Sequence, residues 1–182
     1  MPRKGAKKSF LLTPIGVLRT PFKGLKECPF QGPKEGSLGE IILKKRFLPG
    51  LKDLKGVSHL FLLTFFDQAN RKRLQTVTPY GPELHGVFAT RSPHRPNPIG
   101  LSVVELVKIE GQRIFVRGVD ALDGTPVIDL KPYNPEIDAY PQAVAGWYEK
   151  SKKHSKHLSK PRGPKGGILP ASANIPSEKP KK

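Results

Sequence analysis

The segment GVFATRSPHRPNPIGLS, residues 86–102, gathers two arginines, a histidine and three prolines between two short apolar runs. Pro93, Pro96 and Pro98 each restrict their own φ and push the preceding residue toward extended backbone. Such a loop has little conformational freedom left to lose on binding, and rigid polar loops that join strands often form binding sites. The residues alone leave two interpretations open: a preorganised binding surface, or a stiff turn without a ligand.

A second polar segment, VDALDGTPVIDLKPYNP at residues 119–135, surrounds an Asp-Gly turn. Asp and Gly are ordinary turn formers, so neither residue type indicates a site by itself. Together with the proline-rich loop, the segment supplies carboxylates, backbone amides and an aromatic ring, which suit a small ligand with amine, hydroxyl and heteroaromatic parts. The side chains concerned are Asp120, Asp123, Asp129, Lys131 and Tyr133.

Several kinds of catalytic site are missing from the sequence. Cys28 is the single cysteine, which excludes an intrachain disulfide and a thiolate zinc cage. The five histidines have no accompanying carboxylate cluster, so we expect no metal site. No GxSxG motif occurs, and Ser92 and His94 are too close in an extended loop to act as nucleophile and base. The glycine motifs of doubly wound nucleotide-binding folds are also missing, which excludes that class.

Most of the formal charge of +17 lies at the two ends of the chain. Residues 1–8 hold four Lys and Arg, and residues 150–182 hold ten against a single Glu, which leaves +4 for residues 9–149. Basic arms are typical of proteins with a polyanionic partner, most often nucleic acid, and the alternative is a tail that only aids solubility. We expect a flexible leader at 1–8, a folded domain at 9–150 and a disordered low-complexity tail at 151–182.

The middle of the chain predicts a mainly β fold, because short apolar runs alternate with Pro and Gly. We also expect one or two helical turns at 51–57 and a short closing helix at 141–150. No apolar run reaches the ~20 residues of a membrane span or forms a signal-peptide core, so we expect a cytoplasmic protein without membrane contact. Short strands without a long amphipathic helix predict a small barrel or sandwich. The expected strands are residues 14–20, 40–47, 59–66, 86–90, 102–109, 113–119 and 125–130, with a hairpin at 102–119.

The combination of GVFATRSPHRPNPIGLS with ALDGTPVIDLKPY closely resembles the paired signature of the TsaA-like (TrmO-like) family of tRNA methyltransferases. The segments PIGVLRTPFKGLKECPFQ and GLKDLKGVSHLFLLTFFDQ resemble its other blocks in the right order, so the likeness covers about residues 14–148. It implies a small antiparallel β-barrel that works as a homodimer with S-adenosylmethionine near the subunit contact. It also implies methylation of N6 of threonylcarbamoyladenosine at position 37, in the tRNA anticodon loop.

The resemblance assigns a set of residues to the cofactor site, namely Pro29, Phe30, Gln31, Asp67, Gln68, Arg91, Leu101, Asp120, Ala121, Leu122 and Asp123. Members of the family often have Arg at the position of Phe30 and His at that of Asp67. Some bacterial members also carry a C-terminal domain that helps to bind tRNA, and here a basic tail stands in its place.

The RNA contacts are expected on the other polar residues of the two segments. An arginine guanidinium pairs with either a carboxylate or a phosphate, so the residues alone leave Arg91 and Arg95 open to either ligand. The resemblance favours Arg91 for the cofactor, which leaves His94 and Arg95 for RNA, together with Lys131 and Tyr133. No catalytic residue is assigned, because methyl transfer from a sulfonium depends on positioning more than on a strong base. The alternative function is a non-catalytic RNA-binding β-barrel.

Overall fold

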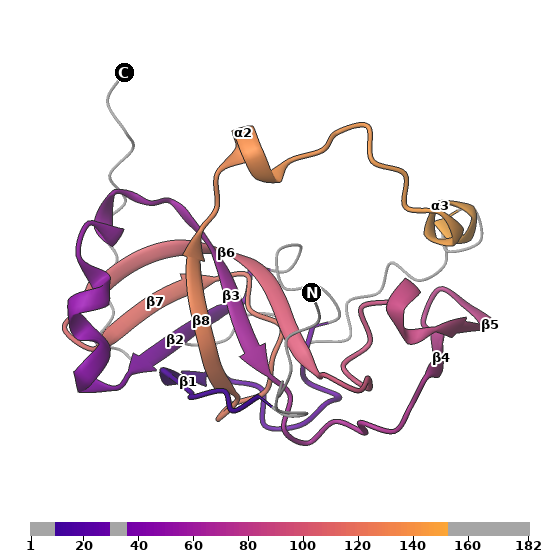
Figure 1. Ribbon diagram of the computed structural model, residues 1–182, viewed down its shortest axis with the longest axis horizontal. Coiled ribbons are helices and arrows are strands. Elements are labelled where there is room, and N and C mark those ends of the chain that lie inside the picture. The colour runs from indigo at the N-terminus through magenta and orange to yellow at the C-terminus, as the bar shows by residue number, and fades with distance from the viewer. Residues whose placement is uncertain (1–9, 30–35, 153–182) are drawn as a thin grey trace, which may run out of the picture.

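Six antiparallel strands close into a barrel in the order β1-β2-β7-β6-β3-β8 (Figure 1). The structure is a computed structural model that describes residues 10–29 and 36–152. The predicted leader, residues 153–182 of the predicted tail, and Phe30 and Gln31 of the predicted cofactor site lie outside these residues. Residues 151 and 152, which we assigned to the tail, are the end of a helix. The barrel confirms the predicted mainly β class. Its strands are β1 (Gly16–Arg19), β2 (Leu38–Leu43), β3 (His59–Phe65), β6 (Ile99–Glu110), β7 (Arg113–Arg117) and β8 (Pro126–Pro132).

Alternation of buried and less buried side chains explains why these segments form the barrel wall. In β3, Leu60, Leu62 and Thr64 are buried and point inward, whereas the residues between them are exposed or only half-buried. Gly100 pairs with Thr64 across β3 and β6. A Cβ atom at Gly100 would collide with Thr64 and with the ring of Phe66, so only glycine allows this close approach. The barrel core consists of Leu18, Phe22, Ile41, Leu60, Leu62, Val104, Ile114, Val116, Val119, Ala121 and Val127.

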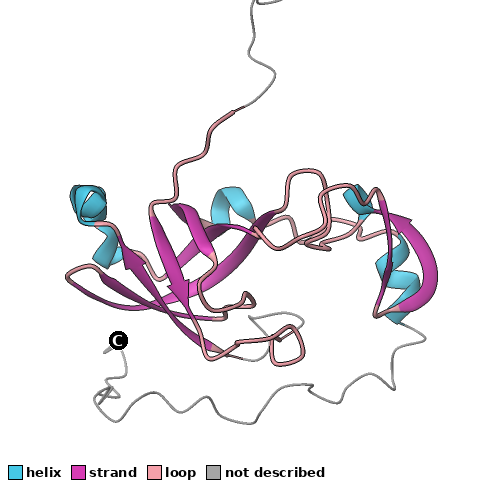
Figure 2. Ribbon diagram, turned by 90° about the horizontal axis from the view of Figure 1, so that it is seen from below, coloured by secondary structure: helices cyan, strands magenta, loops and turns pink. Residues whose placement is uncertain are grey.

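A separate two-stranded sheet, β4 (Gln75–Thr78) and β5 (Gly81–Gly86), stands beside the barrel (Figure 2). The sequence patterns did not predict it. The described chain also contains short helices, and none of its helices is long and apolar enough to cross a membrane. These are the 3₁₀ helices η1 (Lys45–Leu51), η2 (Leu54–Gly56) and η3 (Val87–Ala89), and the α-helices α2 (Pro135–Asp138) and α3 (Trp147–Lys152).

The strand predicted at 86–90 is wrong. β5 ends at Gly86, and Val87–Ala89 turn into η3 because the Val87 side chain is buried and its amide donates to the Leu74 carbonyl at 2.9 Å. This long-range contact overrides the local apolar pattern.

Two other predicted elements have different bounds. The strand predicted at 40–47 stops at Leu43, and Lys45–Leu51 form η1, with Pro49 inside the helix. The helical turns predicted at 51–57 are the end of η1 and η2, and the predicted closing helix is α3, which begins only at residue 147.

Because neighbouring barrel strands are antiparallel, the connections separate onto two ends. The loop end, as we call it, carries the connections at residues 20–37, 66–98 and 118–125, and the helix end carries residues 44–58, the turn at 111–112 and the exit from β8. The β4–β5 sheet belongs to the loop end, whereas η1 and η2, the purple turns at the left of Figure 1, lie at the helix end. The proline-rich segment and the Asp-Gly turn of the second polar segment therefore both lie at the loop end.

Candidate functional site

The proline-rich loop, residues 91–98, is held in place by hydrogen bonds to the segment that leaves β3. The Phe66 amide donates to the Pro98 carbonyl at 2.8 Å, and the Arg71 side chain donates through Nε to the Pro96 carbonyl at 3.1 Å. The Asn70 amide donates to His94 Nδ1 at 3.0 Å. A backbone amide is always a donor, so Nδ1 is the unprotonated nitrogen of His94 and Nε2 carries the ring proton. Asp67 and Gln68 lie in the same segment, and both are exposed.

Arg95 is bonded to the backbone that precedes the loop rather than extended into solvent. Its Nη2 atom donates to the Val87 carbonyl at 2.7 Å and to the Thr90 carbonyl at 3.4 Å. These two carbonyls belong to η3 and to the residue after it. The Arg95 guanidinium thus joins the middle of the loop to η3 and Thr90, and its predicted contact with RNA stays a prediction.

Arg91 connects the loop to the beginning of strand β6. Its Nη2 atom donates to the Leu101 carbonyl at 2.9 Å, and its side chain is exposed. A guanidinium has five N–H donors, so this contact leaves others directed at solvent. The Leu101 side chain is 50% exposed and lies on the same strand segment. The structure therefore places a cation and an apolar side chain, both predicted for the cofactor site, next to each other.

Ser102, the residue after Leu101 on β6, positions Asp120. Ser102 Oγ donates to Asp120 Oδ1 at 2.7 Å, which ties the segment after β7 to the strand that holds Arg91. Sequence reasoning did not single out Ser102, because its partner lies eighteen residues away and depends on the β6–β7 pairing. Arg91 and Asp120 are thus bonded to neighbouring residues at the start of β6, although the side chains of Leu101 and Ser102 point to opposite faces of the strand.

Asp123 sits at the same end but its carboxylate is already bound. Oδ1 accepts from the Thr20 amide at 3.1 Å, and Oδ2 accepts from Lys23 Nζ at 2.7 Å and from Arg19 Nη1 at 3.4 Å. Burial raises its pKa, but the hydrogen bonds from Lys23 and Thr20 and the charges of Lys23 and Arg19 together hold the pKa below its usual value. The following Gly124 has φ +83°, which the tight turn requires.

Three other residues predicted for the cofactor site are buried or packed against the barrel core. Ala121 is 5% exposed, and Leu122 packs against the barrel core. Pro29, the last residue described before the gap, is also buried. These three predicted cofactor residues therefore offer backbone or limited side-chain surface to a ligand.

Lys131 and Tyr133 are not brought to the loop end. They lie at the far end of β8, where Pro132 pairs with Leu60, and the Tyr133 amide donates to the His59 carbonyl at 2.9 Å. The Tyr133 ring packs edge-on against Phe61 at 5.5 Å, and Lys131 forms a 2.9 Å ion pair with Asp129. Their predicted RNA contacts therefore require a second surface, away from the proline-rich loop.

An aromatic cluster beside the loop was not predicted. Trp147 of α3 stacks on His85 of β5, with ring centroids 3.9 Å apart, and its Nε1 donates to the Ala89 carbonyl at 2.8 Å. Tyr80 packs edge-on against Tyr148 at 4.7 Å. No local pattern reveals these contacts, because about sixty residues separate their partners. The cluster fixes α3, and with it the point from which the tail continues, beside η3.

Large apolar side chains are exposed around the loop end. Phe88 of η3 is 82% exposed, although it precedes the most polar segment of the chain. A group of large exposed apolar side chains is typical of a binding or association surface. The group comprises Leu74, Val77, Leu84, Phe88, Ile99 and Leu101.

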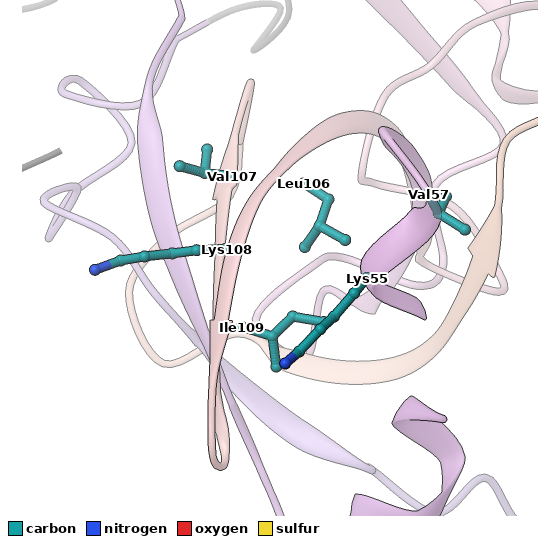
Figure 3. A pocket seen from close by; sticks show the side chains of 6 residues that line it. All are labelled: Lys55, Val57, Leu106, Val107, Lys108 and Ile109. Carbon is teal, nitrogen blue, oxygen red and sulfur yellow. The ribbon is translucent and has the colours of Figure 1, made fainter. Parts of the chain in front are cut away.

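A pocket of about 270 Å³ lies at the helix end instead, between η2 and the end of β6 (Figure 3). None of the residues that we predicted for the site lines it. In the described part of the chain, no group of three or more His, Cys, Asp or Glu side chains is placed to hold a metal ion. The pocket is lined by Lys55, Val57, Leu106, Val107, Lys108 and Ile109.

The loop end combines a guanidinium, carboxylates, an imidazole with a ring proton and exposed apolar side chains. These groups fit an organic ligand that carries a carboxylate, hydroxyl or amine groups and an aromatic ring. S-adenosylmethionine has this set of groups, so the residues present fit the cofactor that the sequence resemblance implies. Nothing in the described geometry resembles a nucleophile with an adjacent strong base.

Comparison with known proteins agrees with this interpretation. A probable S-adenosyl-L-methionine-binding protein of Archaeoglobus fulgidus is 48% identical over 145 residues, which cover 80% of this chain and 40% of the relative. An S-adenosyl-L-methionine-binding protein of the same organism is 46% identical over 132 residues, covering 72% of this chain and 95% of the relative. The tRNA (adenine(37)-N6)-methyltransferase of Escherichia coli is 37% identical over 150 residues, covering 76% of this chain and 64% of that enzyme.

The fold is also similar to that of solved structures. The crystal structure of TrmO from Pseudomonas aeruginosa has a TM-score of 0.65 and 38% sequence identity, covering 78% of this chain and 62% of that chain. This chain thus spans less than two thirds of that protein, of the Escherichia coli enzyme and of the first archaeal relative. The model of the tRNA-methyltransferase O N-terminal domain matches residues 17–139, so the chain belongs to that family.

Proposed function

We propose that this protein is an S-adenosylmethionine-dependent methyltransferase that modifies N6 of the adenine at position 37 of tRNA. The observation that carries the proposal is the contact series at the loop end, in which Arg91 is bonded to Leu101 and the adjacent Ser102 is bonded to Asp120. It supports the proposal because Arg91 and Asp120, both assigned to the cofactor from the sequence, are bonded to neighbouring residues at the start of β6. The Escherichia coli relative is named for this reaction.

Three residues hold the cofactor in this proposal. The N–H donors of Arg91 that do not reach Leu101 bind the carboxylate of S-adenosylmethionine, since a guanidinium pairs bidentately with carboxylates. Asp120 accepts from amine or hydroxyl groups, and the exposed Leu101 side chain covers an apolar part of the ligand. When bound, the cofactor supplies an electrophilic methyl group on a sulfonium.

The protein contributes orientation rather than strong acid–base chemistry. The stiff proline-rich loop holds the target base at a set distance, which lowers the entropy cost of the displacement. His94 presents its Nε2 proton to RNA, and Asp67 accepts a hydrogen bond from the target nitrogen. Our finer proposal is that the adenine carries the threonylcarbamoyl group, as the resemblance implies.

Association into a homodimer completes the site. The exposed apolar side chains around the loop end, Phe88 and Leu84 among them, support contact with a second copy. Such a contact would cover apolar surface that a single chain leaves in water, and it would exclude water from the reacting groups. Sedimentation of the protein with and without Phe88→Asp tests it, because a charge in the contact should favour the monomer.

The basic arms add affinity for tRNA outside the folded domain at 9–150. The C-terminal arm continues from α3, which is fixed beside η3 by Trp147. If the arm binds phosphates, deletion of residues 151–182 should weaken tRNA binding and flatten its salt dependence by ~0.7–0.9 in log–log slope for each phosphate that is no longer neutralised. An unchanged slope would mean that the arm only aids solubility.

Two measurements test the activity against a non-catalytic RNA-binding barrel. S-adenosylmethionine at ~100 times its dissociation constant should stabilise the folded protein by about 2.7 kcal/mol in thermal unfolding. Mass spectrometry of anticodon-loop nucleosides from cells with and without the protein should show the methylated nucleoside only where it is present. Absence of both effects would favour the non-catalytic barrel.

A further inference from the structure

The net positive charge of the folded domain is concentrated in one short segment. Residues 9–149 contain eighteen Lys and Arg and fourteen Asp and Glu. The segment 44–55, KKRFLPGLKDLK, holds five of these cations and one carboxylate, which leaves thirteen of each sign in the rest of the domain. This segment forms η1 and η2, at the end of the barrel opposite the candidate methyl-transfer site. Its cations are Lys44, Lys45, Arg46, Lys52 and Lys55, which we call the helix-end cations.

The helix-end cations are exposed, and no ion pair between described residues includes one of them. Cations on the outer face of the barrel are different, because they face carboxylates. Arg113 is bound by Glu40, Arg117 faces Glu105, and Lys108 is 2.8 Å from Glu110. Paired charges cancel at a distance, so the helix-end cations form an uncompensated positive region at η1 and η2, separate from loop-end cations such as Arg71 and Arg91.

The fold holds the backbone that carries these cations. The Lys44 amide donates to the Ile15 carbonyl at 2.9 Å, which fastens the start of η1 to β1. Leu51, Leu54 and Val57 pack against the barrel core. The only carboxylate of the segment, Asp53, lies in the turn between the helices with φ +66°. The helix-end cations therefore project from a fixed platform and not from a free chain end.

The chemistry of the platform favours a nucleic acid over a membrane. A helix that binds a lipid surface presents an exposed apolar face beside its cations. Here Leu51 of η1 and Leu54 of η2 pack against the barrel core, and no large apolar residue of this segment is among the exposed ones. A surface of cations alone fits phosphates, which are contacted without regard to sequence.

The separation of the two barrel ends fits the shape of a stem and loop. β6 runs from the loop end to the helix end through twelve residues, which is roughly 40 Å of strand. An RNA loop held at the proline-rich loop leaves its stem to continue along the barrel. We propose that the helix-end cations bind the phosphate backbone of the stem of the RNA whose loop occupies the methyl-transfer site, an inference that rests on the proposed function.

The test compares two variants of the full-length protein. In the neutral variant, Lys44, Lys45, Arg46, Lys52 and Lys55 are all replaced by Gln. In the charge-retaining control, the four lysines are replaced by Arg and Arg46 by Lys. Both are checked for folding by thermal unfolding and for cofactor binding by calorimetry. The probes are an RNA hairpin with an anticodon stem and loop, and a single-stranded RNA with the loop sequence alone.

The neutral variant should bind the hairpin roughly tenfold or more weakly, and the slope of log affinity against log salt should fall by roughly 3–4. The control should bind like the wild type, and the loop-only RNA should show little difference between the proteins. Equal hairpin binding by the neutral variant and the wild type would overturn the inference and leave the proposed function intact.

Two further outcomes separate the alternatives. If the wild type binds S-adenosylmethionine but neither RNA, the tRNA substrate and this inference both fail. Vesicles of phosphatidylserine and phosphatidylcholine provide the comparison surface. If the wild type binds these vesicles and the neutral variant loses only that binding, the surface belongs to a membrane and not to an RNA stem.

Discussion

Arg91 Nη2 donates a hydrogen bond of 2.9 Å to the carbonyl oxygen of Leu101, ten residues further along the chain. The contact closes the proline-rich loop onto the start of β6 and holds the exposed guanidinium at the edge of the barrel. An arginine held in this way needs little further ordering before it binds an anion. The site therefore combines a fixed cation with donors that the fold itself does not use.

Replacement of Arg91 by Ala should weaken S-adenosylmethionine binding about 10–100-fold, because a hydrogen bond to a charged group contributes about 1.5–3 kcal/mol. The affinity of Arg91→Lys for S-adenosylmethionine should lie between those of the wild type and Arg91→Ala, since an ammonium cannot pair bidentately. Isothermal titration calorimetry measures both. Arg113→Ala is the matched control, because this exposed arginine is paired with Glu40 at the helix end and should leave cofactor affinity unchanged. Full affinity in Arg91→Ala would remove Arg91 from the cofactor site.

Ser102 should act as a positioning residue for Asp120. Ser102→Ala removes the 2.7 Å hydrogen bond to Oδ1, so we expect a few-fold rise in the dissociation constant for S-adenosylmethionine and a decrease of about 1 kcal/mol in folding free energy. Ser102→Thr keeps the hydroxyl and should restore cofactor affinity. Calorimetry and urea unfolding separate the two effects. Lower stability without any change in affinity would show that the hydrogen bond is only structural.

Arg95 should stabilise the folded state even without RNA. Its guanidinium is bonded to the carbonyls of Val87 and Thr90, so Arg95→Ala should cost about 1–3 kcal/mol in free energy of unfolding. Arg95→Lys should recover only part of it, because one ammonium replaces a planar fork. The midpoint of thermal unfolding of the free protein measures this. An unchanged midpoint with weaker RNA binding would instead support a direct contact of Arg95 with RNA.

Acid should weaken the fold through Asp123. Its pKa lies below the usual value, so ionisation is favoured in the folded state and the stabilising contribution is complete above the ordinary carboxylate pKa of about 4. The contribution is lost as the pH falls through the lowered pKa. The free energy of unfolding, measured with urea, should decline from about pH 7 to about pH 3. This range runs from roughly three units above to one unit below the ordinary pKa.

The control for this pH dependence is Asp123→Asn. The amide cannot attract Lys23 and Arg19 by charge, so the variant should be less stable at neutral pH and should show a flatter decline toward acid. A decline as steep as that of the wild type would assign the acid sensitivity to other carboxylates.

Trp147 reports on the docking of α3, because it is the only tryptophan of the chain. His85→Ala removes the stacked ring and should cost about 0.5–1.5 kcal/mol of this packing, with a shift of the Trp147 emission to longer wavelength. Tyr140→Ala is the control, since this exposed tyrosine precedes α3 without forming part of the cluster. An emission spectrum that stays unchanged in His85→Ala would contradict the stacked arrangement in solution.

Short-range patterns in the sequence determined the mainly β class and most of the barrel strands. An almost continuous apolar run predicted β3, and two apolar runs on either side of residues 110–112 predicted the β6–β7 hairpin. The residues of the loop end were also recognisable from the family resemblance. Where a local pattern conflicted with a distant contact, prediction failed. The apolar segment at 86–90 became η3 because Val87 is buried and its amide is bonded to Leu74.

Only the tertiary structure decided which polar residues lie at the same end of the barrel. Arg91 contacts Leu101, and Ser102 contacts Asp120, because the barrel closes and brings the ends of different strands together. Lys131 and Tyr133 follow the Asp-Gly turn closely in sequence, yet β8 carries them about 20 Å away at about 3.3 Å per residue.

The proline-rich loop was stiff by its composition alone, since proline restricts the backbone in any fold. The sequence also showed that residues 44–55 carry an excess of positive charge. This charge lies at the end of the barrel opposite the proline-rich loop, because the segment joins the end of β2 to the start of β3. Direction and pairing depend on contacts between residues far apart in the chain, which no local pattern contains.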